Sequence, residues 1–409
     1  MNLRSKLPPK LRQFATVGAL IKLPLLPFAF ITIAFVLIVR PLVVIKFHKV
    51  NPWRIGHLLM EVEVTRLNAL HKSNTGLRKH LIIYYFPERT PANAYLVKKW
   101  KEVLPTIQGN WGWLIMSLAQ KISRSSFIIN ASNRDSKNLL PKIPENLRFS
   151  DTEIHHGDNF LQSVNCANKK FVCLMVRDSA YLSAIRTGKS FLKYEYRDSE
   201  ISTYRDAAEF LTELGYTVFR MGQIVKNPLI SNNPRIIDYA TNGMRTEFLD
   251  LYLGANCQFC ISTGAGFDCI PQIFRRPIMY VNMVGFYEDI ATNNFIIHPK
   301  IYHDKHSQKF LSLREIAKRG IASEVEIESF IRANTIVKDL TSIEILKSVS
   351  EMESRVNNTY LPSNLQIQLR DKSRKIFKTD PHLQGPLNSG VMRGEFASCF
   401  LEKYPNFLD

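Results

Sequence analysis

The sequence predicts an α/β protein built around parallel sheets, divided into two domains and preceded by a membrane-associated segment. Apolar runs typical of buried strands alternate with helix-like patterns through most of the chain, as they do in repeated βα units. The chain has 409 residues, more than the ~250–300 that one hydrophobic core usually serves. Its hydrophobic fraction of 45% and charged fraction of 22% are those of a folded protein.

The first predicted element is a membrane anchor over residues 1–50, whose apolar part extends over about residues 23–45. Residues 23–39 carry no charge, a marginal length for a span, which needs ~20 apolar residues. No small-residue cleavage site follows, which favours a retained anchor over a signal peptide. Whether it spans the bilayer or bends back along anionic lipid stays open, because basic residues flank both ends: Arg4, Lys6, Lys10, Arg12 and Lys22 before it, and Arg40, Lys46, Lys49 and Arg54 after it.

The next predicted unit, residues 51–165, is an N-terminal α/β domain with a linker. A helical stripe over residues 51–75 is followed by a continuous strand pattern at 80–86 and a helix that begins at Pro91. The loop between strand and helix leaves the carboxyl end of the strand, where open α/β sheets bind ligands. Glu88 and Asn93 in this loop are therefore candidate site residues, with a turn and helix capping as the alternative role.

Residues 130–169 are polar and are interpreted as the connection between domains. The acidic pair Asp151 and Glu153, followed by His155 and His156, has side chains that could serve as ligands or as a general base. A solvated linker is the favoured interpretation of this segment.

The C-terminal domain is predicted over residues 166–345, with a helical tail at 346–409 that packs back on it. Its strand patterns come at residues 171–176, 216–219, 259–262 and 278–281, and helix patterns lie between them. This alternation predicts a parallel sheet whose carboxyl ends share one edge.

Two of these strands end in arginine, and a third ends in a glycine-bearing turn. Arg177 and Asp178 follow the first strand, Arg220 ends the second, and Ser262-Thr263-Gly264-Ala265-Gly266 ends the third. Glycine and backbone N–H groups suit anion binding, and arginine forms bidentate bonds to phosphate. We expect these residues to form a diphosphate pocket; the alternatives are surface arginines and an ordinary turn.

The net charge of +18 favours anionic partners. Nucleic acid is disfavoured because the basic residues are dispersed and no nucleic-acid-binding motif is present. No metal site is predicted, because Asp-x-Asp after a strand and His-Glu-x-x-His are absent, and Gly-x-Ser-x-Gly, Walker and dinucleotide fingerprints are absent too. The six cysteines, including Cys257 and Cys260, are interpreted as buried free thiols in a reducing compartment.

Several segments in one order resemble a family of bacterial glycosyltransferases associated with surface-polysaccharide (O-antigen or capsule) synthesis. The resemblance covers most of residues 80–400 and is carried by residues 172–181 (VCLMVRDSAY), 196–204 (YRDSEISTY), 215–222 (GYTVFRMG), 236–240 (IIDYA), 248–253 (FLDLYL), 260–266 and 310–316. It implies a GT-B-like fold, in which two Rossmann-like domains face a cleft and the C-terminal one holds a nucleotide-activated sugar.

The implied activity is metal-independent transfer of a sugar to a membrane-associated polysaccharide or lipid-linked acceptor at the cytoplasmic face of the inner membrane. The nucleotide sugar is a substrate, and no cofactor is expected. Glu88 is the first candidate for the base that deprotonates the acceptor and His155 the second. The alternatives are a pyruvyl-type transferase acting on the same glycans and a non-catalytic membrane-anchored assembly factor. The oligomeric state is not predicted.

Overall fold

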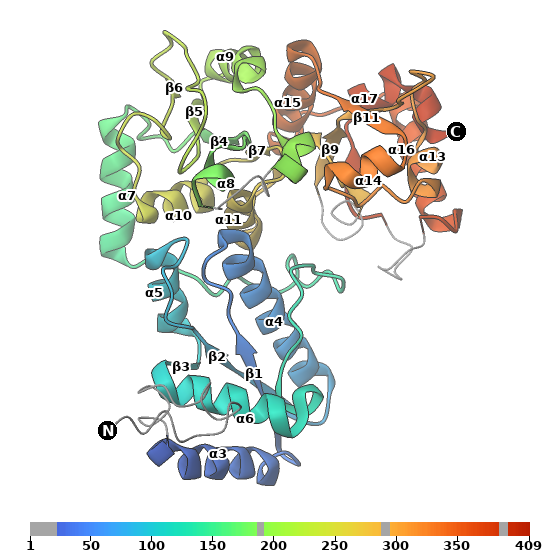
Figure 1. Ribbon diagram of the computed structural model, residues 1–409. Helices are drawn as coiled ribbons and strands as arrows, with labels where there is room; N and C mark the ends of the chain where they lie inside the picture. Colours follow the sequence, from blue (N-terminus) through green and yellow to red (C-terminus); the bar gives the residue numbers. More distant parts are fainter. Residues whose placement is uncertain (1–22, 186–191, 288–294, 384–391) are drawn as a thin grey trace, which may run out of the picture. The chain divides into compact units, whose positions relative to one another are not determined.

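The computed structural model describes residues 23–185, 192–287, 295–383 and 392–409, and the chain divides into two compact units, residues 1–133 and 134–409 (Figure 1). Unit 1 contains η2 (Leu23–Leu25), α3 (Leu26–Ile38), β1 (Val43–Lys49), α4 (Ile55–Thr75), β2 (Lys79–Tyr85), α5 (Ala94–Val103), β3 (Thr106–Ile107) and α6 (Gly109–Phe127). The basic residues that precede the predicted anchor lie outside the described residues.

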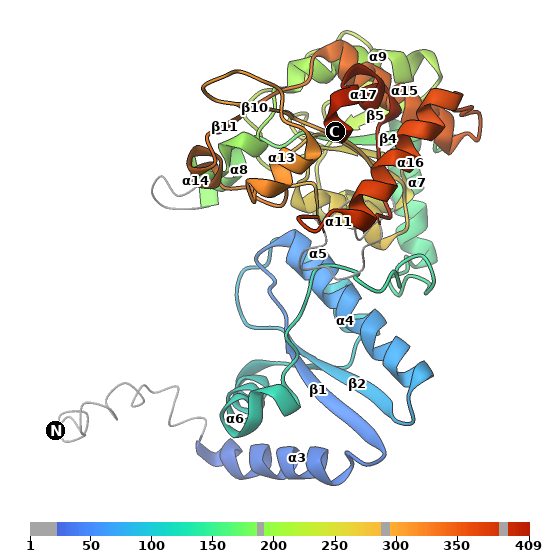
Figure 2. The same ribbon diagram turned by 90° about the vertical axis from the view of Figure 1, so that its right-hand side faces the viewer.

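Unit 1 is a small α/β unit around a three-stranded parallel sheet of order β1-β2-β3. Helix α4 covers one face of this sheet and α6 the other, and α3 packs on α6 (Figure 2). The core between the strands, α6 and α3 is apolar, with Phe47, Leu114, Ile115 and Ala119 at its centre. This unit ends at residue 133 and takes in strand β1, so its bounds differ from those of the predicted domain at residues 51–165.

The structure divides the apolar segment that was predicted as a continuous membrane anchor. Helix α3 has 13 residues, and Val43–Lys49, the continuation of the apolar run, is strand β1, which pairs with β2. Within the described parts of the chain, no helix is long and apolar enough to cross a membrane. The predicted extension of the anchor to about residue 45 is wrong, because its last residues belong to strand β1. A continuous apolar run is the signature of a buried parallel strand as well as of a membrane segment.

Unit 2 contains the larger sheet and most of the helices. In chain order its elements are α7 (Asp151–Ser163), β4 (Phe171–Met175), α8 (Ala180–Ile185), η3 (Leu192–Arg197), η4 (Ile201–Tyr204), α9 (Arg205–Glu213), β5 (Thr217–Arg220), β6 (Ile236–Ile237), α10 (Glu247–Asn256), β7 (Cys260–Ser262), η5 (Gly266–Asp268), α11 (Cys269–Ile273), β8 (Ile278–Met283), β9 (Ile296–Pro299), β10 (Ile301–Asp304), α13 (Leu313–Lys318), α14 (Ile327–Arg332), β11 (Thr335–Lys338), α15 (Ser342–Val356), α16 (Asn364–Thr379), β12 (Glu395–Phe396), α17 (Ser398–Lys403) and η6 (Pro405–Leu408).

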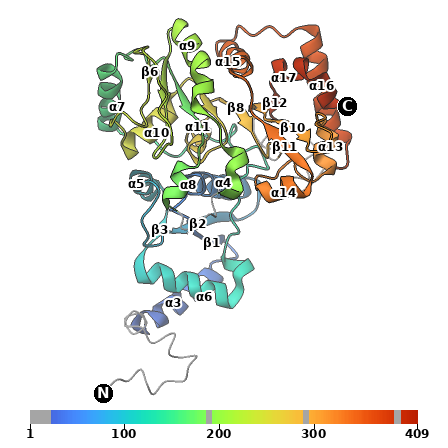
Figure 3. The same cartoon turned by 45° about the horizontal axis from the view of Figure 1, so that its top comes forward.

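The seven strands of the main sheet are all parallel and lie in the order β12-β9-β8-β7-β4-β5-β6. Helices α9 and α15 pack on one face, and α7, α10 and α11 lie on the other (Figure 3). The strands are almost entirely buried on both faces, which explains their continuous apolar sequence patterns. The predicted parallel α/β class is confirmed.

The polar connection predicted at residues 130–169 contains a helix. Ser150 caps α7 by accepting a hydrogen bond from the Glu153 backbone N–H, and the Glu153 side chain accepts one from the Ser150 N–H. This capping box is visible in the sequence as Ser-x-x-Glu. The helix was not recognised in the sequence because α7 has few apolar residues. Only Gly157 and Leu161 of this helix are buried.

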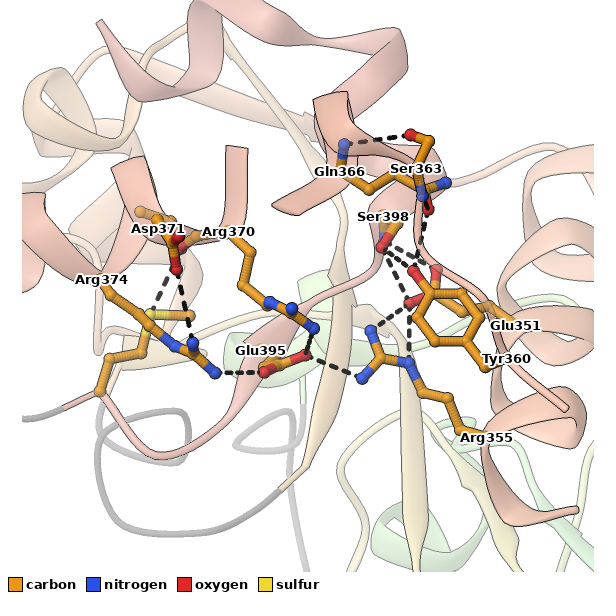
Figure 4. A network of polar contacts seen from close by, with 12 residues as sticks. Glu351, Arg355, Tyr360, Ser363, Gln366, Arg370, Asp371, Arg374, Glu395 and Ser398 are labelled. Carbon is orange, nitrogen blue, oxygen red and sulfur yellow. Dashed lines mark hydrogen bonds and ion pairs between the residues drawn. The ribbon is translucent and has the colours of Figure 1, made fainter. Parts of the chain in front are cut away.

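The C-terminal tail is part of unit 2 and adds an edge strand, β12, to its sheet. The Glu395 carboxylate of β12 accepts hydrogen bonds from Arg355 of α15 at 2.8 Å and from Arg374 of α16 at 2.5 Å (Figure 4). Glu351 of α15 accepts a hydrogen bond from the Ser398 backbone N–H at 2.7 Å. The predicted boundary between residues 345 and 346 falls inside helix α15. Ion pairs with Glu395 thus join α15, α16 and β12.

We expect His298 of β9 to make unit 2 sensitive to acid. Its side chain is 1% exposed, Nδ1 lies 2.6 Å from Ser348 Oγ, and burial lowers the pKa of His298 to about 3. A lowered folded-state pKa means that the unfolded chain binds the proton more readily, so stability is lost as pH falls below about 6.5.

This contribution is about 2 kcal/mol between pH 7 and pH 5. Urea unfolding at the two pH values should show that His298→Gln loses less stability on acidification than the wild type by about that amount. Equal acid sensitivity of the two proteins would contradict the prediction.

Candidate active site

The candidate site lies where the order of the strands reverses in unit 2. From β4 the chain adds β5 and β6 on one side, then returns to place β7, β8 and β9 on the other. Such a reversal opens a crevice at the carboxyl ends of the two strands that flank it, here β4 and β7. Arg177 and Asp178 follow β4, and the turn at residues 262–266 follows β7, so the structure brings these predicted residues together.

Arg177 is held firmly at this edge. Its backbone N–H donates to Thr263 Oγ1 at 2.8 Å, which joins the ends of β4 and β7. Its guanidinium donates to the Tyr194 carbonyl at 3.1 Å and forms an ion pair with Asp198. The side chain is only 10% exposed, so this cation is fixed in place and largely buried at the edge of the sheet.

The turn after β7 satisfies most of its own backbone groups. Thr263 N–H donates to Met175 O, Gly264 N–H to Ser262 Oγ, and Ala265 N–H to Asp268 Oδ2. Ser262 Oγ in turn donates to Asp268 at 2.9 Å, and the hydroxyl of Thr263 accepts the Arg177 N–H. The N–H groups of Thr263, Gly264 and Ala265 therefore already have protein acceptors.

Gly264 has a different role in this turn. Its φ of +83° lies in the left-handed region, where a side chain adds strain. Its carbonyl accepts a hydrogen bond from Arg197. The turn, whose Gly266 is exposed, thus fixes a second arginine at this edge of the sheet.

Two cations complete the cluster, and the sequence indicated them weakly or not at all. Arg197, which lies in the segment 196–204 of the family resemblance, ends η3 and lies beside Arg177. Lys300 follows β9, is 3% exposed, and reaches Asp339 at 2.6 Å and the Asp198 carbonyl at 2.6 Å. We call Arg177, Arg197 and Lys300 the cation cluster. Lys300 was missed because the strand before it, at residues 296–299, was not recognised.

Arg177 is largely buried, and its partner Asp198 is partly buried. Burial, reinforced by the charge of Arg197, lowers the pKa of Arg177 to about 10. Burial also raises the pKa of Asp198 to about 6, although the Arg177 guanidinium opposes this shift. Asp198 therefore begins to lose its charge at mildly acidic pH, where the cluster becomes more positive.

Arg220, the second predicted donor-binding arginine, has a different environment from Arg177. It is 0% exposed, and its guanidinium lies 3.4 Å from Asp238, 3.9 Å from Asp178 and 3.2 Å from the Asn227 carbonyl. Asp178 accepts the Ala180 and Lys226 N–H groups. Arg220 therefore braces the loops after β4 and β5 from beneath, which differs from the expected arginine facing a ligand.

Asn282 links the cluster to the rest of the edge. It lies in a bulge of β8, with φ of +55°, and its amide donates to Ser199 and Tyr204 while accepting from the Leu340 N–H at 2.7 Å. Ser199 also contacts Asp339. These bonds hold the loops that carry Asp198 and Asp339 in fixed positions.

The two candidate bases belong to different units. Glu88 is exposed in the loop after β2 of unit 1, near Gly109 at the start of α6, and together with burial it raises the pKa of Tyr85. His155 is exposed on α7 of unit 2, which packs against α10, and lies near Asp158. Asn93 caps α5 by accepting the Leu96 N–H at 2.7 Å, the capping role considered for it.

Comparisons with known proteins found similar chains among solved structures. No protein-family model and no curated protein matches the sequence. Among solved structures, the chain is similar to glycosyl transferases. One is a glycosyl transferase of family 9 from Veillonella parvula DSM 2008 (TM-score 0.41, 9% identity, 76% of this chain and 97% of that chain). Another is ADP-heptose LPS heptosyltransferase II of E. coli (TM-score 0.33, 13% identity, 57% and 84%). Both TM-scores lie below 0.5, so a functional assignment has to come from the residues of this chain.

Proposed function

We propose that the protein is a glycosyltransferase that takes a sugar from a nucleotide-activated donor. The observation that carries the proposal is the cation cluster of Arg177, Arg197 and Lys300 at the point where the strand order reverses in a parallel sheet. A diphosphate has the complementary charge, and the crevice at such a reversal is where open α/β sheets bind nucleotides.

Each member of the site has a proposed role. Arg177 neutralises the departing nucleoside diphosphate, and Arg197 and Lys300 add positive charge beside the largely buried Arg177, where that charge acts strongly. Leaving-group stabilisation is thus assigned to side-chain cations. Gly264 keeps the turn free of a side chain so that phosphate can approach. The turn is given this shaping role because most of its N–H groups are already bonded.

The acceptor is proposed to be a membrane-associated polysaccharide or lipid-linked glycan, as the resemblance implies. Deprotonation of its hydroxyl is assigned to Glu88, with His155 as the second candidate. Support for Glu88 comes from its exposure at the carboxyl end of β2, the edge of a parallel sheet where ligands are expected.

We expect a nucleoside diphosphate or sugar nucleotide to raise the melting temperature of the full chain. Ligand at about 100 times its Kd stabilises the folded state by about 2.7 kcal/mol, which is a shift of several degrees for a protein of this size. The measurement is thermal unfolding against a panel of such compounds.

The Arg235→Ala variant is a control for substitutions in the cation cluster. Arg235 is exposed and lies at the amino end of β6, whereas the cluster lies at the carboxyl ends of the strands of the same sheet. The control should retain the shift. Stabilisation by phosphoenolpyruvate alone would indicate pyruvyl transfer instead, and no shift with any compound would favour a non-catalytic role.

A further inference from the structure

Helix α3 leaves a band of large apolar side chains exposed on unit 1. Its inner face, with Ala29, Ile33 and Val36, packs in the core beside α6. Its outer face and the turn that follows expose six side chains by 52% to 75%: Phe28, Phe30, Ile31, Phe35, Ile38 and Leu42. We call these six residues the apolar band. Folded soluble proteins rarely expose so many large apolar groups together.

The band lies on the outside of unit 1. Figure 2 shows α3 on the side of α6 that faces away from the strands. Helix α3 packs on α6 through Ala29, Ile33 and Val36, which leaves its opposite side exposed. Its 13 residues give a length of about 20 Å, shorter than the ~30 Å of a bilayer's hydrocarbon core.

Four cations gather beside the carboxyl end of α3: Arg40, Lys46, Lys72 and Arg78. Arg78 Nη1 donates to the Arg40 carbonyl at 3.4 Å. Burial lowers the pKa of Lys46, and the nearby charges of Lys72 and Arg40 lower it further. Burial, Lys72, Arg78 and Lys46 likewise lower the pKa of His80. In the described parts of the chain, none of the four forms an ion pair with a carboxylate.

We propose that unit 1 docks on an anionic membrane surface, with the apolar band in the interface between headgroups and acyl chains and the four cations against lipid phosphates. An apolar helix face with aromatic side chains, bordered by basic residues, is the composition of helices that lie in the plane of a membrane. Anionic lipid also relieves the mutual repulsion of the four cations.

A second copy of the chain fits this surface less well than lipid does. A twofold interface places the same patch of each copy against the other. It would bring together two groups of cations that have no carboxylate partner among the described residues. The inference is independent of the proposed sugar transfer, because no residue of the apolar band or of the four cations belongs to the candidate active site.

The test is sedimentation of the full chain with vesicles of phosphatidylglycerol and phosphatidylethanolamine in equal parts, compared with phosphatidylcholine vesicles. We expect binding to the anionic vesicles that weakens on raising the salt from 0.1 M to 1 M, since the Debye length falls from ~10 Å to ~3 Å. The triple variant Ile31→Asn, Phe35→Asn, Ile38→Asn should bind at least about tenfold more weakly.

Two controls separate docking from general stickiness and charge. The Ile343→Asn, Leu361→Asn variant changes side chains that are 63% and 90% exposed in unit 2, and it should bind like the wild type. Arg40→Ala, Lys72→Ala should lower anionic-vesicle binding about tenfold or more, whereas the exposed pair Lys305→Ala, Lys309→Ala of unit 2 should not.

A photo-crosslinking residue at position 35 identifies what covers the apolar band. Crosslinks to lipid support the proposal. Crosslinks to a second copy or to residues 1–22 without any to lipid, or unchanged vesicle binding by the α3 triple variant, would overturn it. Circular dichroism checks folding, which these exposed substitutions should leave intact.

Discussion

Arg177→Met is expected to lower kcat/KM for sugar transfer by about 100-fold or more, with most of the loss in kcat. A fixed cation that meets charge developing on a leaving group stabilises the transition state by about 2.7–4 kcal/mol. Arg177 fits this role because the Thr263 bond and the Asp198 ion pair fix it in place before any ligand binds. Steady-state kinetics with the donor found by thermal screening measures the effect.

Three further variants show whether the loss of activity comes from removal of the Arg177 charge. Arg177→Lys keeps the charge but loses the planar fork, so an intermediate loss is expected. Arg177→Met, Asp198→Asn removes both members of the ion pair and should be as inactive as Arg177→Met, although no unpaired carboxylate remains. Arg235→Ala should have wild-type kinetics. A folded Arg177→Met protein with turnover within about threefold of wild type would refute the role.

The meeting of Arg177 with the turn at residues 262–266 was predictable because parallel strands impose it. Two strands with continuous apolar patterns had to lie in one sheet, and their carboxyl ends had to share an edge. The sequence does not reveal that β4 and β7 are immediate neighbours. That adjacency depends on where the chain reverses the strand order, which is a property of the whole sheet.

Other parts of the site could not be predicted, because they depend on contacts distant in sequence. Lys300 joins the cluster through Asp339 and the Asp198 carbonyl, and neither contact leaves a local pattern. The backbone N–H groups of the turn looked available because the sequence does not show that Asp268 and Ser262 accept their hydrogen bonds. Local motifs indicate which groups are present, whereas their partners are set by the fold.

The apolar run at the start of the chain shows the same limit. Residues 23–39 and 41–45 are similarly apolar. The first segment contains helix α3 (Leu26–Ile38), whereas the second leads into strand β1 (Val43–Lys49). Hydrophobic content alone does not distinguish a lipid-facing helix from a buried strand. Pairing of β1 with β2 decides the outcome, because the backbone groups of β1 find their partners there.

The second prediction with a large expected effect concerns Arg220. Like Arg177, it lies at the carboxyl end of a strand, but it is fully buried beside the carboxylates of Asp178 and Asp238. Arg220→Met is expected to lower the free energy of unfolding by about 3–5 kcal/mol, because it leaves the carboxylates of Asp178 and Asp238 without their buried cation. Urea unfolding at neutral pH measures this loss.

Neutralising the two carboxylates distinguishes a structural brace from a donor contact. In Arg220→Met, Asp178→Asn, Asp238→Asn, the amide oxygens still accept the Lys226 and Leu229 N–H groups, and no buried charge remains unpaired. At least half of the lost stability should return in this triple variant. The triple variant should also show the nucleotide-induced shift in melting temperature. If Arg220→Met is instead as stable as wild type within about 1 kcal/mol and loses that shift, Arg220 contacts the donor directly, and the bracing role inferred from its burial is wrong.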